Sequence, residues 1–365
     1  MAKGSRASAG AVASFASLAS YRTRTMRAVM AEMGDELTVF AGTPAPDVAT
    51  RLVDYDALGI RTLRNRYVLG GRVTIQNSPI RALLGAQVAL VDLNPRMVLN
   101  WPILLIRRLL GRPTLVWGHA WPRQGRGSRT DTVRGWMRRL ANGVITYTES
   151  QAEELRQIYP GKPITAAPNA LYYRDEFAET SNEGERDAII YVGRLVAEKK
   201  PALLVEAFNV VAATHPRIRL SIVGDGKDSD LITHLVSRSP FRERITMHGH
   251  CEDASELQRL YSAAVLSVSP GYVGLAATQS FAMGVPMVIA RDEPHAPEIE
   301  AAVEGVNALF FREDDAVDLA RVIGSMLDDS GSWEQRRGEI QRRCQNRYSV
   351  EAMASGLVTA IRGMA

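Results

Sequence analysis

The sequence predicts an α/β protein built from two doubly wound domains, each with a parallel sheet covered by helices. Two observations predict this class. The 365 residues exceed the size of a usual single core, and short apolar strands alternate with helical segments along most of the chain. Apolar residues make up 46% and charged residues 23%, as in globular proteins, so a compact soluble fold is expected.

The N-terminal half alternates less regularly than the rest, and we expect one domain over residues 1–170. Strands are predicted at 11–16, 37–40, 88–93, 114–117, 143–147 and 164–167. Helices are predicted at 22–33, 132–140 and 150–159. The polar, acidic and aromatic segment 171–185 has no periodicity and suits a linker.

The C-terminal half alternates more cleanly, and we expect a second domain over residues 186–348. Its predicted strands are 188–192, 218–223, 244–248, 265–268 and 286–290. Its predicted helices are 201–214, 229–238, 254–262 and 274–283. A last helix follows Ser349, a residue that can cap it.

Several classes of protein are disfavoured. Cys251 and Cys344 have no disulfide or metal-ligand spacing, which favours a reduced, cytoplasmic setting. The longest apolar stretch, 98–110, is interrupted by polar residues and is shorter than the roughly 20 residues of a membrane-spanning helix. A pI of about 9.1 suggests nucleic-acid binding as a candidate function. However, no helix-turn-helix, zinc-finger or RNP-like pattern is visible in the sequence. We expect a protein that is neither exported nor transmembrane and binds no nucleic acid.

The most informative segment begins where the strand 188–192 ends. Gly193 and Arg194 follow the strand, and Lys199 lies five positions after the arginine. Two cations just past a buried strand can clamp a polyanion, and glycine lets that ligand approach the backbone. The pattern favours a nucleoside diphosphate site; taken alone, the same spacing also fits ordinary surface cations in a lysine-rich turn.

Further motifs follow in order: Gly224-Asp225-Gly226, His248-Gly249, Ser269-Pro270, Gly274-Leu275, Ala282-Met283-Gly284-Val285-Pro286 and Pro297-Glu298-Ile299. Together with the Gly193-to-Lys199 turn, their order and spacing resemble the nucleotide-sugar domain of family 4 glycosyltransferases. The resemblance continues more weakly upstream, at Tyr21-Arg22, 145–150 and 168–170.

The resemblance implies the GT-B fold, in which two Rossmann-like domains face a central cleft and the C-terminal helix, here 349–365, crosses back to the N-terminal domain. It also implies an acceptor in the first domain, a nucleotide sugar in the second, and transfer with retention and without a metal or other cofactor. Arg194 and Lys199 would stabilise the charge that grows on the diphosphate. His119, after the strand 114–117, would lie near the reacting atoms. The donor pocket would comprise Gly193, Gly224, Gly249, Gly271, Tyr272, Val273, Gly274, Leu275, Gln279, His295 and Glu298.

The chain departs from the family pattern at Gly271 and Gln279, where the family usually carries two glutamates. In the family the first contacts the donor sugar and the second the ribose hydroxyls. Two interpretations remain open. The pair indicates either a different donor, such as a dTDP-linked or deoxy sugar, or a catalytically silent nucleotide-sugar scaffold or sensor.

Basic residues are concentrated between 107 and 139, with tryptophans among them. The basic residues are Arg107, Arg108, Arg112, Arg123, Arg126, Arg129, Arg134, Arg138 and Arg139, against the single acid Asp131. Arg123, Arg126 and Trp121 are candidates for an acceptor or anionic membrane surface. A solvated arginine-rich face, or a phosphate-binding patch without membrane contact, is the alternative.

Together these features predict a cytoplasmic hexosyl- or deoxyhexosyltransferase, peripheral on the inner face of the cell membrane. It would transfer a sugar from a nucleoside diphosphate donor to a surface polysaccharide, lipid-linked glycan or glycolipid.

Overall fold

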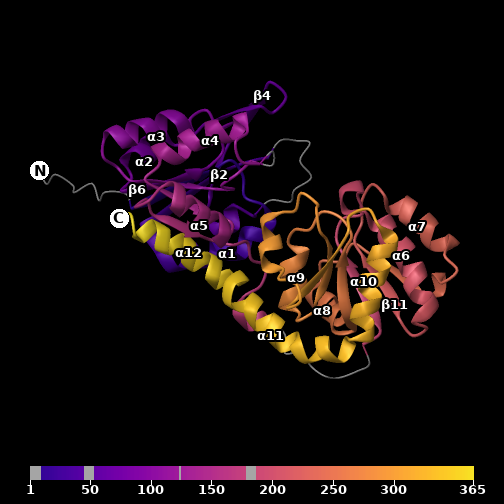
Figure 1. Ribbon diagram of the computed structural model, residues 1–365. Helices are drawn as coiled ribbons and strands as arrows, with labels where there is room; N and C mark the ends of the chain where they lie inside the picture. Colours follow the sequence, from indigo (N-terminus) through magenta and orange to yellow (C-terminus); the bar gives the residue numbers. More distant parts are fainter. Residues whose placement is uncertain (1–9, 45–52, 123–124, 178–185) are drawn as a thin grey trace, which may run out of the picture. The chain divides into compact units, whose positions relative to one another are not determined.

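A computed structural model describes residues 10–44, 53–122, 125–177 and 186–365. The chain divides into two compact units, one formed by residues 1–171 with 350–365 and the other by 172–349. Each unit contains a parallel sheet with helices on both faces (Figure 1). The predicted two-domain α/β class is confirmed.

The N-terminal unit contains a seven-stranded parallel sheet of order β3-β2-β1-β6-β7-β8-β9. Its strands are β1 (Ala11–Phe15), β2 (Leu37–Gly42), β3 (Arg61–Leu63), β6 (Val88–Asp92), β7 (Thr114–Trp117), β8 (Gly143–Thr146) and β9 (Ile164–Ala166). The strand order reverses between β1 and β6. In open parallel sheets, such a reversal leaves a crevice at the carboxyl ends of the two strands.

Helices cover both faces of this sheet. On one face α1 (Thr23–Met33) packs against α12 (Val350–Arg362), so the C-terminal segment returns to the N-terminal unit as expected. The other face carries α2 (Ile80–Gly85), α3 (Asn100–Leu109), α4 (Arg129–Leu140) and α5 (Glu149–Ile158). None of the helices in the described ranges combines the length and apolarity needed to cross a membrane.

An antiparallel hairpin, β4 (Asn65–Val68) with β5 (Val73–Gln76), supports the end of β1. The Asn65 side chain donates to the carbonyl of Ala16 over 2.7 Å, and the Gln76 side chain donates to that of Phe15 over 3.0 Å. Buried carbonyls at a strand end need such partners. The sequence pattern predicts neither this hairpin nor β3, α2 and α3.

The second unit contains a six-stranded parallel sheet of order β12-β11-β10-β13-β14-β15, the Rossmann order. Its strands are β10 (Ala188–Val192), β11 (Arg219–Val223), β12 (Ile245–Gly249), β13 (Ala264–Ser269), β14 (Met287–Ala290) and β15 (Ala308–Phe311). The order reverses between β10 and β13. The motifs singled out in the sequence follow these two strands.

Two helical layers enclose this sheet (Figure 1). One layer contains α6 (Pro201–Thr214), α7 (Ser229–Arg238) and α10 (Ala316–Asp328). The other contains α8 (Ala254–Ser262), α9 (Ala276–Ala282) and α11 (Ser330–Tyr348). Within the predicted linker, Phe177 packs into the core of this unit and Gln345 donates to the carbonyl of Arg174 over 2.8 Å. This part of the linker is therefore packed, and 178–185 lie outside the described residues.

Candidate active site

The turn after β10 is fixed by its neighbours. The amide of Gly193 donates to Val223 over 3.0 Å, and the amide of Leu195 donates to Asp225 over 2.9 Å. Gly224 has a φ of 145°, and a Cβ there would lie 1.8 Å from the carbonyl oxygen of Gly193. Only glycine fits such an approach. The backbone is thereby held rigidly while the Arg194 side chain stays exposed.

The charge of Lys199 lies near that of Arg194. It ends the 3-10 turn Ala197–Lys199, and its Nζ donates to the carbonyl of Tyr272 over 2.6 Å and lies 4.6 Å from the centre of that ring. Burial and the nearby Arg194 charge lower the pKa of Lys199 to about 8, although Glu298 and Glu198 oppose them. An anion placed here would stabilise the charged lysine.

Gly271 is required by the packing of its loop. A Cβ at this position would lie 2.5 Å from the carbonyl oxygen of Glu198 and 2.9 Å from the carbonyl carbon of Lys199. The next amide, of Tyr272, donates to the same Glu198 oxygen over 2.8 Å. The loop lies directly on the turn that carries Lys199, and this backbone leaves no room for a glutamate side chain at 271.

His295 holds the same loop from the other side. Its Nδ1 accepts from the amide of Val273 over 3.0 Å, so Nε2 carries the proton and donates to the carbonyl of Ala290 over 2.8 Å. Burial lowers the pKa of His295, which favours this neutral ring. Both ring nitrogens are therefore used within the protein, and the histidine positions residues 272–274.

The remaining predicted residues of this unit gather at the same sheet edge. Gly249 accepts from the amide of Gly224 over 2.7 Å, and Glu298 is buried in the first turn of the 3-10 segment Pro297–Ala301. Gly274 and Leu275 lead into α9, where Gln279 donates to the Tyr172 hydroxyl over 3.0 Å.

The N-terminal unit has a cavity of about 570 Å³ at the switch point of its own sheet. Residues that follow β1, β6, β7 and β8 form most of its wall. The lining residues are Ala16, Ser17, Arg22, Asp92, Leu93, Asn94, Pro95, Arg96, Trp117, Gly118, His119, Pro122, Thr130, Arg134 and Tyr147. His119, predicted from its place after β7, is thus on the cavity wall.

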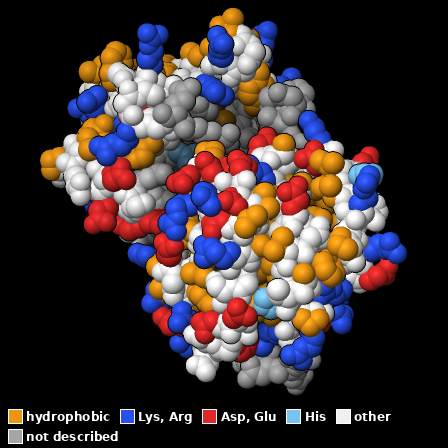
Figure 2. Space-filling view, turned by 45° about the vertical axis from the view of Figure 1, so that its right-hand side comes forward, with side chains coloured by type: hydrophobic (Ala, Val, Ile, Leu, Met, Phe, Trp, Pro, Cys, Tyr) orange, Lys and Arg blue, Asp and Glu red, His pale blue; other side chains and the backbone are white. Residues whose placement is uncertain are grey.

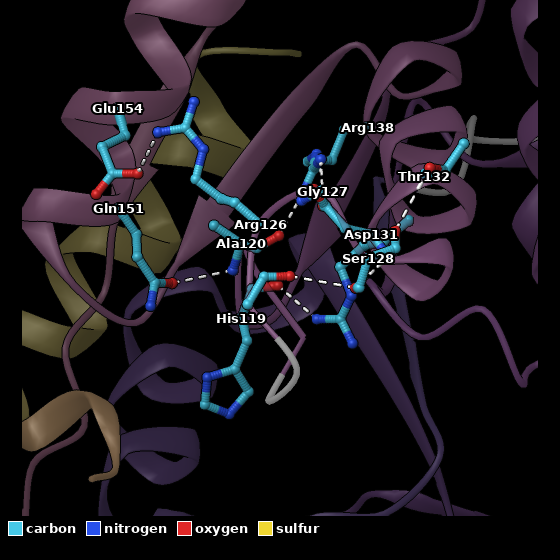
Figure 3. A network of polar contacts seen from close by, with 12 residues as sticks. His119, Ala120, Arg126, Gly127, Ser128, Asp131, Thr132, Arg138, Gln151 and Glu154 are labelled. Atoms are coloured by element: carbon cyan, nitrogen blue, oxygen red, sulfur yellow. Dashed lines mark hydrogen bonds and ion pairs between the residues drawn. The ribbon is translucent and has the colours of Figure 1, made fainter. Parts of the chain in front are cut away.

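The His119 loop is held by α4 and α5 (Figure 3). Arg134 donates to the carbonyl of His119 over 2.6 Å, and the amide of Ala120 donates to Gln151 over 2.9 Å. Arg138 donates to the carbonyl of Ala120 and pairs with Asp131 at 2.9 Å. The imidazole extends away from this network in the figure and lies edge-on to the Tyr147 ring, 4.8 Å between ring centres.

The cavity wall also carries two groups of opposite charge, Arg22 and Asp92. The Arg22 guanidinium carbon lies 4.5 Å from the centre of the Trp117 ring and 5.0 Å from that of Tyr147. Asp92 accepts from the amide of Ala16. Burial raises the pKa of Asp92 to about 6, against the opposing effects of the Ala16 hydrogen bond and the Arg22 charge.

The predicted basic surface needs correction. Arg107 is fully buried and donates to four backbone carbonyls and the Thr114 hydroxyl, and Arg138 is buried beside Asp131. Neither contributes to a surface. Trp121 and Arg126 line a separate hollow of about 360 Å³, and Arg126 pairs with Glu154 at 3.3 Å. Arg123 lies outside the described residues.

The sequence analysis did not single out Asp92, Arg96, Arg134 or Tyr147 as site residues. Two of them had a usable signal, since Asp92 is the last residue but one of the predicted strand 88–93 and Tyr147 is the last residue of the predicted strand 143–147. Polar residues at the carboxyl ends of parallel strands are site candidates. Arg134 lies inside a helix rich in arginine, where the pattern does not distinguish it.

The second unit is similar in sequence to a known protein family. Residues 173–346 match the family model described as "Glycosyl transferases group 1". The match covers most of the second unit. A "Glycogen synthase" of Mycobacterium tuberculosis is 26% identical over 229 residues, 61% of this chain and 54% of the relative. A "D-inositol 3-phosphate glycosyltransferase" of Nocardiopsis dassonvillei is 25% identical over 208 residues, 51% of this chain and 48% of the relative. The chain spans about half the length of the curated relatives it matches.

Among solved structures, Anabaena Alr3699/HepE in complex with UDP matches with a TM-score of 0.70 at 14% identity, over 97% of this chain and 100% of that one. The similarity establishes the fold of both units. The chain has the two-domain α/β fold known as GT-B.

Proposed function

We propose that this protein is a glycosyltransferase that moves a sugar from a nucleoside diphosphate donor to a glycan or glycolipid acceptor. The observation that carries the proposal is the cationic pair Arg194 and Lys199, held at the switch point of the unit that matches the group 1 family model by the Leu195–Asp225 and Tyr272–Glu198 backbone hydrogen bonds. Parallel sheets bind ligands at this point. The names of the curated relatives support the same class of reaction.

In the proposed mechanism the second unit binds the donor. The diphosphate gains negative charge as its bond to the sugar breaks, and two fixed cations stabilise that charge more in the transition state than in the ground state. Arg194 and Lys199 supply this charge, so we propose transfer without a metal ion, and with retention of configuration. Undiminished activity in EDTA would support metal independence.

His119 and its cavity would serve the acceptor. The loop is anchored from α4 and α5, so the imidazole can be held close to the reacting oxygens without rearrangement. In this proposal His119 touches substrate, whereas His295 acts as a positioning residue for the 272–274 loop.

We further propose that the donor differs from that of family members with two glutamates. A side chain at position 271 would collide with the carbonyl oxygen of Glu198. At position 279 the side chain is a neutral amide, hydrogen-bonded to the Tyr172 hydroxyl. Neither position therefore supplies a carboxylate to the donor. A dTDP-linked or deoxy sugar has fewer hydroxyls that need a carboxylate partner at these two positions. Isothermal titration with UDP, GDP and dTDP tests this, and a clear preference for UDP contradicts it.

Transfer assays with a panel of nucleotide sugars test the activity itself. We expect turnover or slow donor hydrolysis with at least one donor, and its loss in Arg194→Ala. The alternative is a catalytically silent nucleotide-sugar sensor, favoured by the missing glutamates at Gly271 and Gln279. Nucleotide binding without turnover of any donor would establish that alternative.

A second proposal concerns the outer face of α3 and α4, which we expect to rest on anionic lipid. Leu109 is 78% exposed and Trp136 60% exposed, and Arg108, Arg112 and Arg139 are exposed on or beside the same helices. Figure 2 shows hydrophobic and basic side chains intermixed over the upper part of the N-terminal unit. Exposed apolar groups ringed by arginine suit the interface of an anionic membrane.

Liposome co-sedimentation at low salt tests this surface. We expect vesicles with phosphatidylglycerol to retain the protein, and the double variant Leu109→Glu with Trp136→Glu to remain in the supernatant. Leu231→Glu, on the 52% exposed position of α7, is the matched control and should still sediment. Equal sedimentation of all three proteins would remove the proposal.

A further inference from the structure

The cavity of the N-terminal unit contains more positive than negative charge. Among the described residues that line it are three arginines, Arg22, Arg96 and Arg134, and one carboxylate, Asp92. Asp92 is already engaged, because it accepts from the Ala16 amide and lies near Arg22. The Arg96 and Arg134 charges therefore face the cavity without a carboxylate of their own in its wall.

Arg134 lies in an environment that favours an added anion. Its Nε is buried and has no hydrogen-bond partner in the part of the chain that the structure describes, while one Nη donates to the carbonyl of His119. Burial and the nearby Arg138 and Arg96 charges lower its pKa, with Asp131 opposing. A buried N–H without a partner is unfavourable, and an oxyanion on this guanidinium would supply that partner and offset the repulsion from Arg138 and Arg96.

We infer that the acceptor carries an oxyanion, a phosphate or a carboxylate, which binds between Arg96 and Arg134 beside His119. The inference rests on the proposed function and narrows its acceptor class. Arginine forks match the planar or tetrahedral oxygens of such groups. Because Arg134 also holds the His119 carbonyl, anion binding and the position of the His119 loop are linked through one side chain.

A binding experiment separates this inference from the proposed donor site. The full chain is first saturated with the nucleoside diphosphate it binds best, so that Arg194 and Lys199 are occupied, and is then titrated with glucose 6-phosphate or with glucose. We expect the phosphorylated sugar to bind at least tenfold more tightly. The double variant Arg96→Gln with Arg134→Gln should lose that preference while its nucleotide affinity stays unchanged.

Arg129→Gln is the matched control, because it removes an exposed arginine that lies on the same helix as Arg134 and does not line the cavity. It should bind as the wild type does. Equal binding of glucose and glucose 6-phosphate, or a preference that survives the double variant, would overturn the inference. Absence of nucleotide binding would instead contradict the proposed function.

The source of the anion follows from competition. Vesicles of phosphatidylcholine with and without phosphatidylglycerol are added to the complex with glucose 6-phosphate. Release by the anionic vesicles alone identifies a lipid-borne oxyanion. Retention in the presence of both vesicles identifies a soluble or glycan-borne one. The double variant reports whether any vesicle binding uses Arg96 and Arg134 or only the outer face of α3 and α4.

Discussion

The two units place candidate sites at the same point of two similar sheets but build them differently. In the second unit the backbone forms the site, through glycines at 224, 226 and 271 whose backbone neighbours leave no room for side chains. In the N-terminal unit side chains from five separate segments form it, and Arg22, Asp92 and Arg134 come to line one cavity only after folding. A site built from the backbone requires glycine at particular positions, and the spacing of these glycines along the chain is a recognisable pattern. A side-chain-built site leaves little pattern along the chain.

The strongest test of this difference removes the cations of the backbone-built site. Arg194→Ala or Lys199→Ala should lower kcat/KM by about 10²–10³-fold, the usual cost of losing a preorganised charge in the transition state. Steady-state transfer assays measure the effect. Lys227→Ala, an exposed lysine of the same unit, should change the rate less than twofold. A comparable loss in all three variants would contradict a specific role for the pair.

Steric exclusion at Gly271 gives the next largest effect. Gly271→Glu forces the loop away from Glu198 and Lys199, and overpacking of this kind costs about 1–3 kcal/mol, so we expect a lower Tm and at least a tenfold weaker nucleotide affinity. Calorimetry and titration measure the two quantities. At Gly324 in α10 a Cβ would lie 3.8 Å from Cε1 of His215, an ordinary contact, and Gly324→Ala should therefore behave nearly as wild type. Improved binding in Gly271→Glu would show that the loop accommodates the glutamate.

Titration of Lys199 gives an effect of about tenfold. Its pKa of about 8 is lower than that of an ordinary lysine, and a diphosphate binds the charged form, so nucleotide affinity should be constant below pH 8 and fall above it. Between pH 7 and 9 the Kd should rise about tenfold. Lys199→Arg stays charged over this range and should give a flat profile. A wild-type profile that is also flat would contradict the assigned pKa direction or the contact.

The difference between the two units also explains how much of the fold could be predicted from the sequence. The strands and helices between 188 and 290 agree with the prediction to within about two residues, because buried parallel strands and glycine turns leave clear signals there. Helix α3 is not among the elements predicted from the sequence, because Pro102 and Arg107 look like breaks in an apolar helical pattern. In the structure Pro102 lies in the first turn, where its missing N–H costs nothing, and Arg107 is buried with its donors satisfied by carbonyls.

Helix α11 shows a different cause. Its buried residues Trp333, Ile340, Cys344 and Tyr348 follow a helical spacing, but the pattern is interrupted by Arg337, a buried charge that donates to the carbonyl of Ala264 over 2.9 Å. A buried arginine that donates to backbone carbonyls looks like a surface residue in the sequence. Both omissions therefore have one physical origin, tertiary partners that turn a polar residue into a core residue.

The smallest effect concerns the anchor of the His119 loop. Gln151→Ala removes the acceptor of the Ala120 amide, so the loop gains freedom and His119 is less often in place. We expect kcat to fall about fivefold, since small misplacements of reacting groups slow catalysis, with unchanged nucleotide affinity because the second unit keeps its site. Glu154→Ala, on the same helix, breaks only the exposed pair with Arg126, worth at most about 1 kcal/mol, and should leave kcat unaltered. Equal losses in both variants would mean that α5 acts through general stability; a loss in Gln151→Ala alone would show that this side-chain-built site depends on single anchors, as the backbone-built site does not.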